Sequence, residues 1–313
     1  MGSLNDVIIE VEKVVKGKQE IVVKVLMAIC ASGHILLEDN PGSGKTTLAK
    51  AFSKAIGLSY KRIQFTPDTM PSDITGYYYM DKDTRSMKYV PGAVQCNLLL
   101  GDEINRTSAK TQSALLEPME EGTITLEGTT QRLPRPFILI ATQNPITSLG
   151  TQPLPDSQSD RFMIKLSMGY PSLKDEVSIL MNTSVDDITA RLNTQMSVSE
   201  LQAIRDYIDK NMTCDEAVVD YICRLCDATR HNELIETGVS TRGSVALKRM
   251  ATAHAYFGGR TYVTPNDVYA VFVDVCNHRI ILSPQAKMEG MDEYSILKDI
   301  MDKQVKAPVL ANR

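Results

Sequence analysis

The stretch that decides the fold lies early in the chain, where residues 34–47 read His-Ile-Leu-Leu-Glu-Asp-Asn-Pro-Gly-Ser-Gly-Lys-Thr-Thr. The short apolar run from His34 to Glu38 predicts a buried strand, and the pattern that follows predicts a helix through Ile56. A glycine-rich turn between a strand and a helix presents backbone N–H groups to an anion at the helix N-terminus. The stretch therefore predicts a phosphate-binding loop.

The residues of this loop have separate expected tasks. Gly42 and Gly44 let the backbone curve around the phosphates of a nucleotide. The Lys45 ammonium reaches the β- and γ-phosphates, and the Thr46 hydroxyl is a ligand for Mg²⁺. The remaining predicted nucleotide-binding residues of the loop are Pro41, Ser43 and Thr47. The general pattern has glycine where this chain has Asp39, and we expect the strand exit to tolerate that change.

Outward from the loop, short apolar runs alternate with helical patterns. Further strands are predicted at residues 60–65, 97–101, 137–142 and 163–166. Strands separated by helices predict an α/β fold with a mostly parallel, doubly wound sheet. In such sheets ligands bind at the carboxyl ends of the strands, where the loop lies.

Two hairpins are expected to interrupt the alternation. The first pairs residues 77–80 with 87–90, and the second pairs residues 123–126 with 130–133 across a turn that contains glycine. The second hairpin follows a helix predicted over residues 108–121, and we therefore expect it to project from the end of a core helix.

After residue 170 the strand signals stop and helix capping boxes begin. The predicted boxes are Ser172 with Asp175, Ser197 with Glu200, Thr213 with Glu216, and Thr264 with Asp267. Each box precedes an amphipathic run. We expect an α/β core over residues 1–170 and a helical domain of four to five helices over residues 171–313.

Two acids follow the apolar strand predicted at residues 97–101. Asp102 ends this strand, where a carboxylate can hold a magnesium-bound water. Glu103 is positioned to act as the general base that polarises the attacking water. The alternative is an ordinary solvated loop that carries two neighbouring acids.

Two further residues are candidates for the same site. Asn144 follows the strand predicted at residues 137–142, from where its amide can reach the γ-phosphate or the water; the alternative is a simple Asn-Pro turn. Arg161 closes a polar loop over residues 154–160. It is either an arginine finger that stabilises transition-state charge on a neighbouring subunit's phosphate or a surface partner of Asp160.

Composition limits the classes of partner. The 313 residues carry 34 Lys and Arg against 38 Asp and Glu, a net charge of −4, so no global positive field attracts nucleic acid or anionic lipid. The apolar stretch from Ile21 to Cys30 is short and contains Lys24, so we expect neither a signal peptide nor a transmembrane segment. These observations predict a cytoplasmic protein.

The ordered set of segments resembles the MoxR family of AAA+ ATPases, from about Lys13 to Ile281. Beyond the segments above, the resemblance includes residues 62–68, 71–76, 104–106, 111–116 and 263–268. It implies an AAA+ P-loop core with a C-terminal helical lid, ATP and Mg²⁺ as ligands, and a homo-oligomer whose usual form is a hexameric ring.

Residue roles follow from that resemblance. Lys45 and Thr46 match Walker A, Asp102 and Glu103 match Walker B, and Asn144 matches sensor 1. Arg161 is then an arginine finger that acts on the neighbouring subunit. The resemblance also implies an adenine-side contact at Gly17, from residues 14–17, and a γ-phosphate contact at Arg242, from residues 238–242. For Arg242 an arginine on a solvated helix face stays open. The hairpin at residues 123–133 is similar to the helix-2 insert of related proteins.

Together these expectations predict one function for the chain and leave other functions open. The chain is expected to hydrolyse Mg-ATP at subunit interfaces and thereby to remodel or assemble a protein partner. In the family such partners often carry von Willebrand A domains. Other readings are a nucleic-acid motor or restriction subunit, a nucleotide-gated scaffold with little turnover, and a metal-chelatase subunit; the net charge disfavours the first.

Overall fold

The structure is a computed structural model that describes residues 4–39, 42–144, 153–181 and 189–308. The chain divides into two compact units. The first comprises Met1–Lys24, His34–Arg161 and Ser167–Gln202, and the second comprises Val25–Gly33, Phe162–Leu166 and Ala203–Arg313. The domain boundary predicted after residue 170 stays a prediction. Within the described ranges, no helix is both long enough and apolar enough to cross a membrane.

The main sheet confirms the predicted fold class. Its strands, in spatial order, are β2 (Tyr60–Gln64), β5 (Leu98–Asp102), β8 (Ile138–Gln143), β1 (Ile35–Glu38) and β9 (Ile164–Leu166). The pairs β2–β5, β5–β8 and β8–β1 are parallel. Each bound differs from its predicted position by at most one residue. β5 is buried along its whole length, which explains its uninterrupted apolar start.

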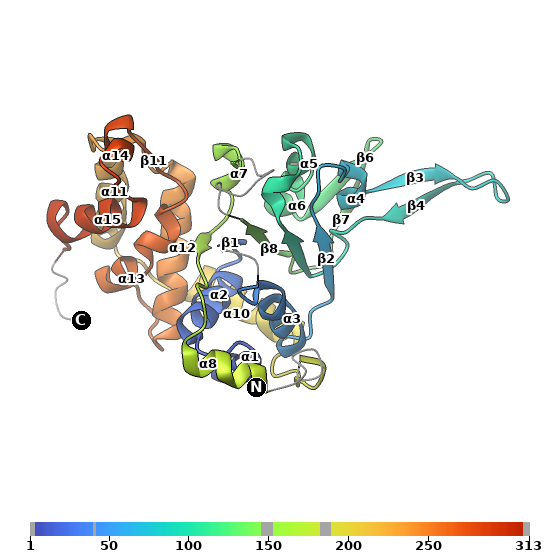
Figure 1. Ribbon diagram of the computed structural model, residues 1–313, viewed down its shortest axis with the longest axis horizontal. Helices are drawn as coiled ribbons and strands as arrows, with labels where there is room; N and C mark the ends of the chain where they lie inside the picture. The colour runs from blue at the N-terminus through green and yellow to red at the C-terminus, as the bar shows by residue number, and fades with distance from the viewer. Residues whose placement is uncertain (1–3, 40–41, 145–152, 182–188, 309–313) are drawn as a thin grey trace. The chain divides into compact units, whose positions relative to one another are not determined.

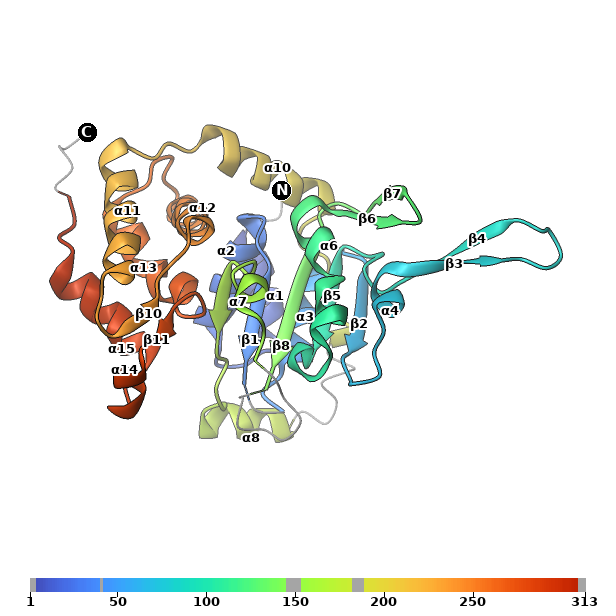
Figure 2. The same ribbon diagram turned by 90° about the horizontal axis from the view of Figure 1, so that it is seen from above.

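Short helices connect and cover these strands (Figure 1, Figure 2). The helices with residues in the first unit include α1 (Leu4–Glu12), α2 (Gln19–Cys30, which continues into the second unit), α3 (Lys45–Ala55), α4 (Pro71–Thr75), α5 (Ala109–Ser113), α6 (Leu116–Glu121), α7 (Asp156–Ser159) and α8 (Leu173–Met181). The polar loop expected over residues 154–160 therefore contains a helical turn, α7, which its sequence pattern did not indicate.

The single helix predicted over residues 108–121 is wrong, because the structure has α5 and α6 with a break at Ala114 and Leu115. Pro118 explains the break. Proline has no N–H to bond the carbonyl four residues earlier, which is that of Ala114, and its ring clashes with this carbonyl. The first helix ends there and a new helix begins, with Pro118 in its first turn.

Both predicted hairpins are present. β3 (Gly76–Met80) pairs with β4 (Met87–Pro91), and Figures 1 and 2 show this hairpin extending away from the sheet. β6 (Thr123–Leu126) pairs with β7 (Thr129–Arg132) across Glu127 and Gly128, both of which have positive φ, as a two-residue hairpin turn requires. The Gln131 amide donates a hydrogen bond of 2.6 Å to the Tyr78 hydroxyl and so joins the two hairpins.

The second unit is mainly helical. Its helices are α10 (Val198–Asn211, which begins in the first unit), α11 (Glu216–Arg230), α12 (Thr241–Phe257), α13 (Pro265–Cys276), α14 (Pro284–Met288) and α15 (Glu293–Asp299), followed by a π-helical turn (Ile300–Gln304). Two short strands, β10 (Ile235–Thr237) and β11 (Ile281–Leu282), pair antiparallel. The expectation of four to five helices without strands after residue 170 is therefore too simple.

Of the four predicted capping boxes, those at Ser197 and Thr264 are complete, the one at Ser172 has, of its two expected bonds, only the bond from the Asp175 N–H to the Ser172 hydroxyl, and the one at Thr213 is wrong. Thr213 does not cap α11, because Asp215 is the N-cap and accepts a hydrogen bond from the Ala217 N–H. The Thr213 backbone instead bonds to Thr261 and Val263.

The capping box of α13 is part of a larger buried network. Asp267 is fully buried and accepts hydrogen bonds from Arg260, from the Thr264 N–H and hydroxyl, and from His254. Burial raises the pKa of Asp267, but the hydrogen bonds from Arg260, His254 and Thr264 outweigh it and hold the pKa well below its usual range. The carboxylate is therefore a strong stabilising group while it is ionised.

We predict that Asp267→Asn lowers the free energy of unfolding by about 3–5 kcal/mol near neutral pH, the usual cost of breaking a buried ion pair. A depressed pKa contributes stability above the unfolded-state value of about 3.9, and that contribution is lost as pH falls below it. Urea unfolding measured between pH 7 and pH 3 should show the difference between wild type and variant shrinking in acid. Asp209→Asn, on the exposed side of α10, is the control. A difference that does not change with pH would contradict this account.

Candidate active site

Strand register brings polar residues together at one edge of the sheet. Gln64 at the end of β2 lies opposite Asp102 at the end of β5, and Glu38 at the end of β1 lies opposite Gln143 at the end of β8. The Gln143 amide donates to the Glu38 carboxylate. Because the strands are parallel, all these ends lie at the carboxyl edge, where ligands of open α/β sheets bind.

The predicted phosphate loop lies between β1 and α3. Gly42 and Gly44 have φ of 88° and 90°, a left-handed backbone that glycine adopts without strain. Pro41 lies outside the described residues. The Ser43 hydroxyl is buried and, within the described part of the chain, has no hydrogen-bond partner, so a ligand oxygen at this loop would supply one. Thr46 and Thr47 are half-buried on the first turn of α3.

Lys45 is the buried cation of this loop. The residue is 7% exposed, and its Nζ donates a hydrogen bond of 2.7 Å to the Asp39 backbone oxygen. Burial lowers the pKa of Lys45, whereas the negative charges of Asp39, Asp102 and Glu103 act in the opposite direction. The loop lysine and both predicted acids therefore lie within electrostatic reach of one another.

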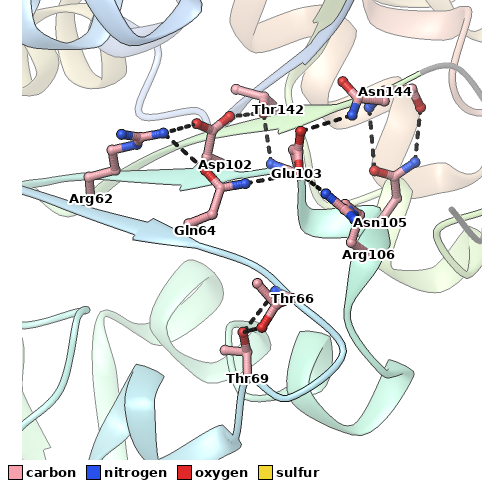
Figure 3. A network of polar contacts seen from close by, with 10 residues as sticks. All are labelled: Arg62, Gln64, Thr66, Thr69, Asp102, Glu103, Asn105, Arg106, Thr142 and Asn144. Carbon is pink, nitrogen blue, oxygen red and sulfur yellow. Dashed lines mark hydrogen bonds and ion pairs between the residues drawn. The ribbon is translucent and has the colours of Figure 1, made fainter. Parts of the chain in front are cut away.

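Asp102 is held by two donors at the end of β5 (Figure 3). Thr142 Oγ1 donates to Asp102 Oδ1 at 2.6 Å, and Arg62 Nη2 contacts Asp102 Oδ2 at 2.6 Å. Mg²⁺ is commonly held by one or two protein oxygens together with water and substrate phosphates. Asp102 and the Thr46 hydroxyl could supply that small set of oxygens, so these residues fit the ion.

Glu103 is positioned through both its backbone and its side chain. Its φ of 57° and ψ of 49° are left-handed, which is uncommon for a residue with a side chain and occurs often at active sites. Its N–H donates to Thr142 Oγ1 at 2.9 Å. The Thr142 hydroxyl thus bonds both acids, accepting from the Glu103 backbone and donating to the Asp102 carboxylate.

Three donors surround the Glu103 carboxylate (Figure 3). Asn144 Nδ2 donates to Oε1 at 3.0 Å, and Gln64 Nε2 donates to Oε2 at 3.0 Å. Arg106 Nη1 contacts Oε2 at 2.8 Å. The structure therefore brings two residues of the predicted site, Glu103 and Asn144, into direct contact.

Asn144 is itself fixed by a neighbour that the sequence motifs did not mark as a site residue. Its backbone oxygen accepts from Asn105 Nδ2 at 2.9 Å, and its N–H donates to Asn105 Oδ1 at 3.3 Å. Both side chains are buried. This bidentate contact locks the segment after β8 onto the turn after β5 (Figure 3).

The structure also adds Arg62, Gln64, Arg106 and Thr142 to the residues predicted from sequence. Gln64 had a usable signal, because a polar side chain ends β2 at the same sheet edge as Asp102. Thr142 was harder to predict from the sequence, because threonine is also common within apolar strands that have no functional role.

The two predicted arginines lie in different units. Arg161 belongs to the first unit, where its guanidinium forms an ion pair with Glu120 of α6 and its Nε donates to the Ser157 backbone oxygen at 3.3 Å. The alternative considered from the sequence was a surface ion pair of Arg161 with Asp160, whereas the ion pair found is with Glu120. Arg242 is an exposed residue in the first turn of α12, in the second unit.

Gly17 lies beside the start of α8. Its φ is 67°, which favours glycine, and a Cβ at this position would lie 2.0 Å from Asp175 Oδ2, so the Asp175 side chain would have to move. Lys18 Nζ donates to the Tyr170 backbone oxygen at 2.7 Å. Gly17, at the end of the predicted adenine-side segment, thus lies next to Asp175, and the following residue, Lys18, bonds Tyr170.

Two protein-family models match the sequence of this chain. Residues 34–164 match the family model described as ATPase family associated with various cellular activities (AAA), and residues 227–300 match an AAA lid domain. Together they span both units of the chain.

Relatives match along nearly the whole chain. YeaC, an uncharacterized Bacillus subtilis protein, is 42% identical over 299 residues, which is 96% of this chain and 93% of the relative. Chaperone MoxR1 from Mycobacterium tuberculosis is 35% identical over 308 residues, 96% of this chain and 81% of the relative. A crystal structure of a candidate ATPase from Cytophaga hutchinsonii superposes with a TM-score of 0.89 at 38% identity, over 98% of this chain and 95% of that one. The chain belongs to the MoxR family of AAA+ ATPases and is an ATP-hydrolysing enzyme with an α/β core and a helical lid.

Proposed function

We propose that hydrolysis occurs at the carboxyl edge of the main sheet, with Glu103 as general base. The observation that carries the proposal is the joint placement of Asp102 and Glu103 by the Thr142 hydroxyl, with Asn144 on the Glu103 carboxylate. Lys45 would hold the β- and γ-phosphates, and Thr46 with Asp102 would hold Mg²⁺, which neutralises phosphate charge when bound.

The three donors on Glu103 define what activation requires. A carboxylate can accept about four hydrogen bonds. Among the described residues Gln64 and Arg106 bond Glu103 Oε2, and Asn144 bonds Oε1. Oε1 therefore keeps capacity for the attacking water, which would donate to Glu103 while its oxygen attacks the γ-phosphorus. Asn144 is the donor best placed to orient that water, because Asn105 keeps its backbone fixed.

Arg161 is proposed to complete the site of a neighbouring subunit in a homo-oligomeric, hexameric ring. Its ion pair with Glu120 leaves the side chain 17% exposed, so the guanidinium must exchange Glu120 for a phosphate to act in trans. Arg242 is proposed as a second γ-phosphate contact and Gly17 as an adenine-side contact. A cytoplasmic location also stays a prediction.

We further propose that the motor acts on a protein partner, and within the family a von Willebrand A domain protein is the first candidate. The M. tuberculosis relative bears the name chaperone, which supports a protein client. The β3–β4 hairpin exposes Tyr77, Tyr79, Met80 and Met87, and such exposed apolar groups favour a protein contact. The turn at residues 127–129 is the second candidate contact.

Mixing two inactive variants tests the shared site. Glu103→Gln and Arg161→Ala should each lose activity, by about a thousandfold for the finger. In an equimolar mixture, random assembly leaves about a quarter of interfaces with an intact Glu103 facing an intact Arg161, and ATPase activity should return. Phosphate release is measured against protein concentration.

The control mixture combines Glu103→Gln with the double variant Glu103→Gln/Arg161→Ala, which restores no interface and should stay inactive. If the first mixture also stays inactive and the wild-type rate per subunit is unchanged by dilution, the site is self-contained and the trans role of Arg161 is wrong.

Thr142→Val tests the placement of the two acids. Valine keeps the shape but removes the hydroxyl that bonds Asp102 and Glu103, so kcat should fall about ten- to a hundredfold, as is usual when a residue that orients active-site ligands is lost. The Mg²⁺ concentration that gives half-maximal rate should rise. Thr142→Ser retains the hydroxyl and should keep most activity. Equal losses in the valine and serine variants would show that packing, and not the hydroxyl, is responsible.

A further inference from the structure

Asp39 stands where the phosphate-loop pattern has glycine, and its carboxylate is buried, with the residue 8% exposed. A buried carboxylate is costly unless hydrogen bonds satisfy it. Asp39 Oδ1 accepts from Ser167 Oγ at 2.8 Å and from the Gly169 N–H at 3.0 Å, and Oδ2 accepts from the Met168 N–H at 2.5 Å. One acid thus collects three donors from three consecutive residues.

The segment that supplies these donors continues to the predicted adenine side of the site. Tyr170 accepts from Lys18 through its backbone oxygen, and Asp175, in the first turn of α8, fills the space beside Gly17. Residues 167–175 therefore run from the phosphate loop to residues 17–18, within the first unit. Without Asp39, the described contacts would leave residues 167–169 without this anchor on the loop.

The direction of the hydrogen bonds also explains why an acid is tolerated beside a phosphate site. Charged hydrogen bonds from two backbone N–H groups and one hydroxyl stabilise the carboxylate on the side of residues 167–169. Lys45 Nζ donates to the backbone oxygen of Asp39.

We propose that Asp39 is a positioning residue for nucleobase recognition: it fastens residues 167–169 to the phosphate loop and so fixes the segment that continues to Gly17 and Lys18. The proposal rests on the nucleotide site proposed above. It implies that a substitution of Asp39 changes binding of the base without weakening binding of the phosphates. Removing the carboxylate should weaken contacts to the base, yet leave or improve contacts to the phosphates, because a negative charge is lost.

The experiment compares two ligands that share phosphates but differ in the base. Calorimetric Kd values are measured for Mg-ATP and for magnesium tripolyphosphate, on wild type and on Asp39→Gly, the usual loop residue. We expect the Kd for ATP to rise about tenfold, equivalent to about 1.4 kcal/mol, while the Kd for tripolyphosphate stays the same or falls. The preference for ATP over GTP should fall in parallel. Equal changes for both ligands, or none, would overturn the proposal.

Matched variants separate this effect from misfolding and from failure of the site itself. Asp39→Asn keeps the shape and should lie between wild type and Asp39→Gly. Ser167→Ala removes one of the three donors; it should weaken ATP binding slightly in the wild type and add nothing in Asp39→Gly, since it acts through the same contact. Asp83→Asn, an acid removed at the β3–β4 turn, should change neither Kd.

Lys45→Ala tests the site independently. If it binds ATP as tightly as wild type, the proposed nucleotide site is wrong. If it loses both ligands while Asp39→Gly fails to distinguish them, the site stands and only the role of Asp39 is refuted.

Discussion

The parallel pairing of β5 with β8 is the constraint on which the site depends. Leu98 to Gly101 lie opposite Ile138 to Ala141, and this register fixes where each strand ends. Side chains alternate between the two faces of a strand, so a slip of one residue would turn Thr142 away from Asp102. The apolar residues of both strands, buried in the core, resist that slip. The positions of Asp102 and Glu103 are therefore secured by the packing of residues outside the candidate site.

Much of this arrangement could be predicted, because the relevant signals are local. The apolar run before Asp102 and the glycines before Lys45 identify strand ends and loop curvature directly. Asn144 was expected from its place after a strand, and the structure puts it on Glu103. The doubly wound sheet followed from strands that alternate with helices, and the comparisons confirm this fold.

What was missed depends on contacts between distant segments or on steric detail. Gln64 and Arg62 reach the acids only because β2 pairs with β5. Thr213 was predicted to cap α11, but the cap is Asp215, the residue directly before the helix. Gly243 lies in the first turn of α12, where a Cβ would lie 2.5 Å from Val239 Cγ1, so close packing favours the glycine. No periodicity in the sequence reports such an approach.

The hydrogen bond between Gln131 and Tyr78 has a mechanical consequence. It ties β7 to β3, so a pulling force on the tip of the β3–β4 hairpin is shared between two lengths of chain. One runs from β4 into β5, which ends at Asp102, and the other runs from β7 into β8, which leads to Asn144. A load taken up at the hairpins would strain both strands together, so Glu103, which follows β5, and Asn144, which follows β8, would feel the same tension.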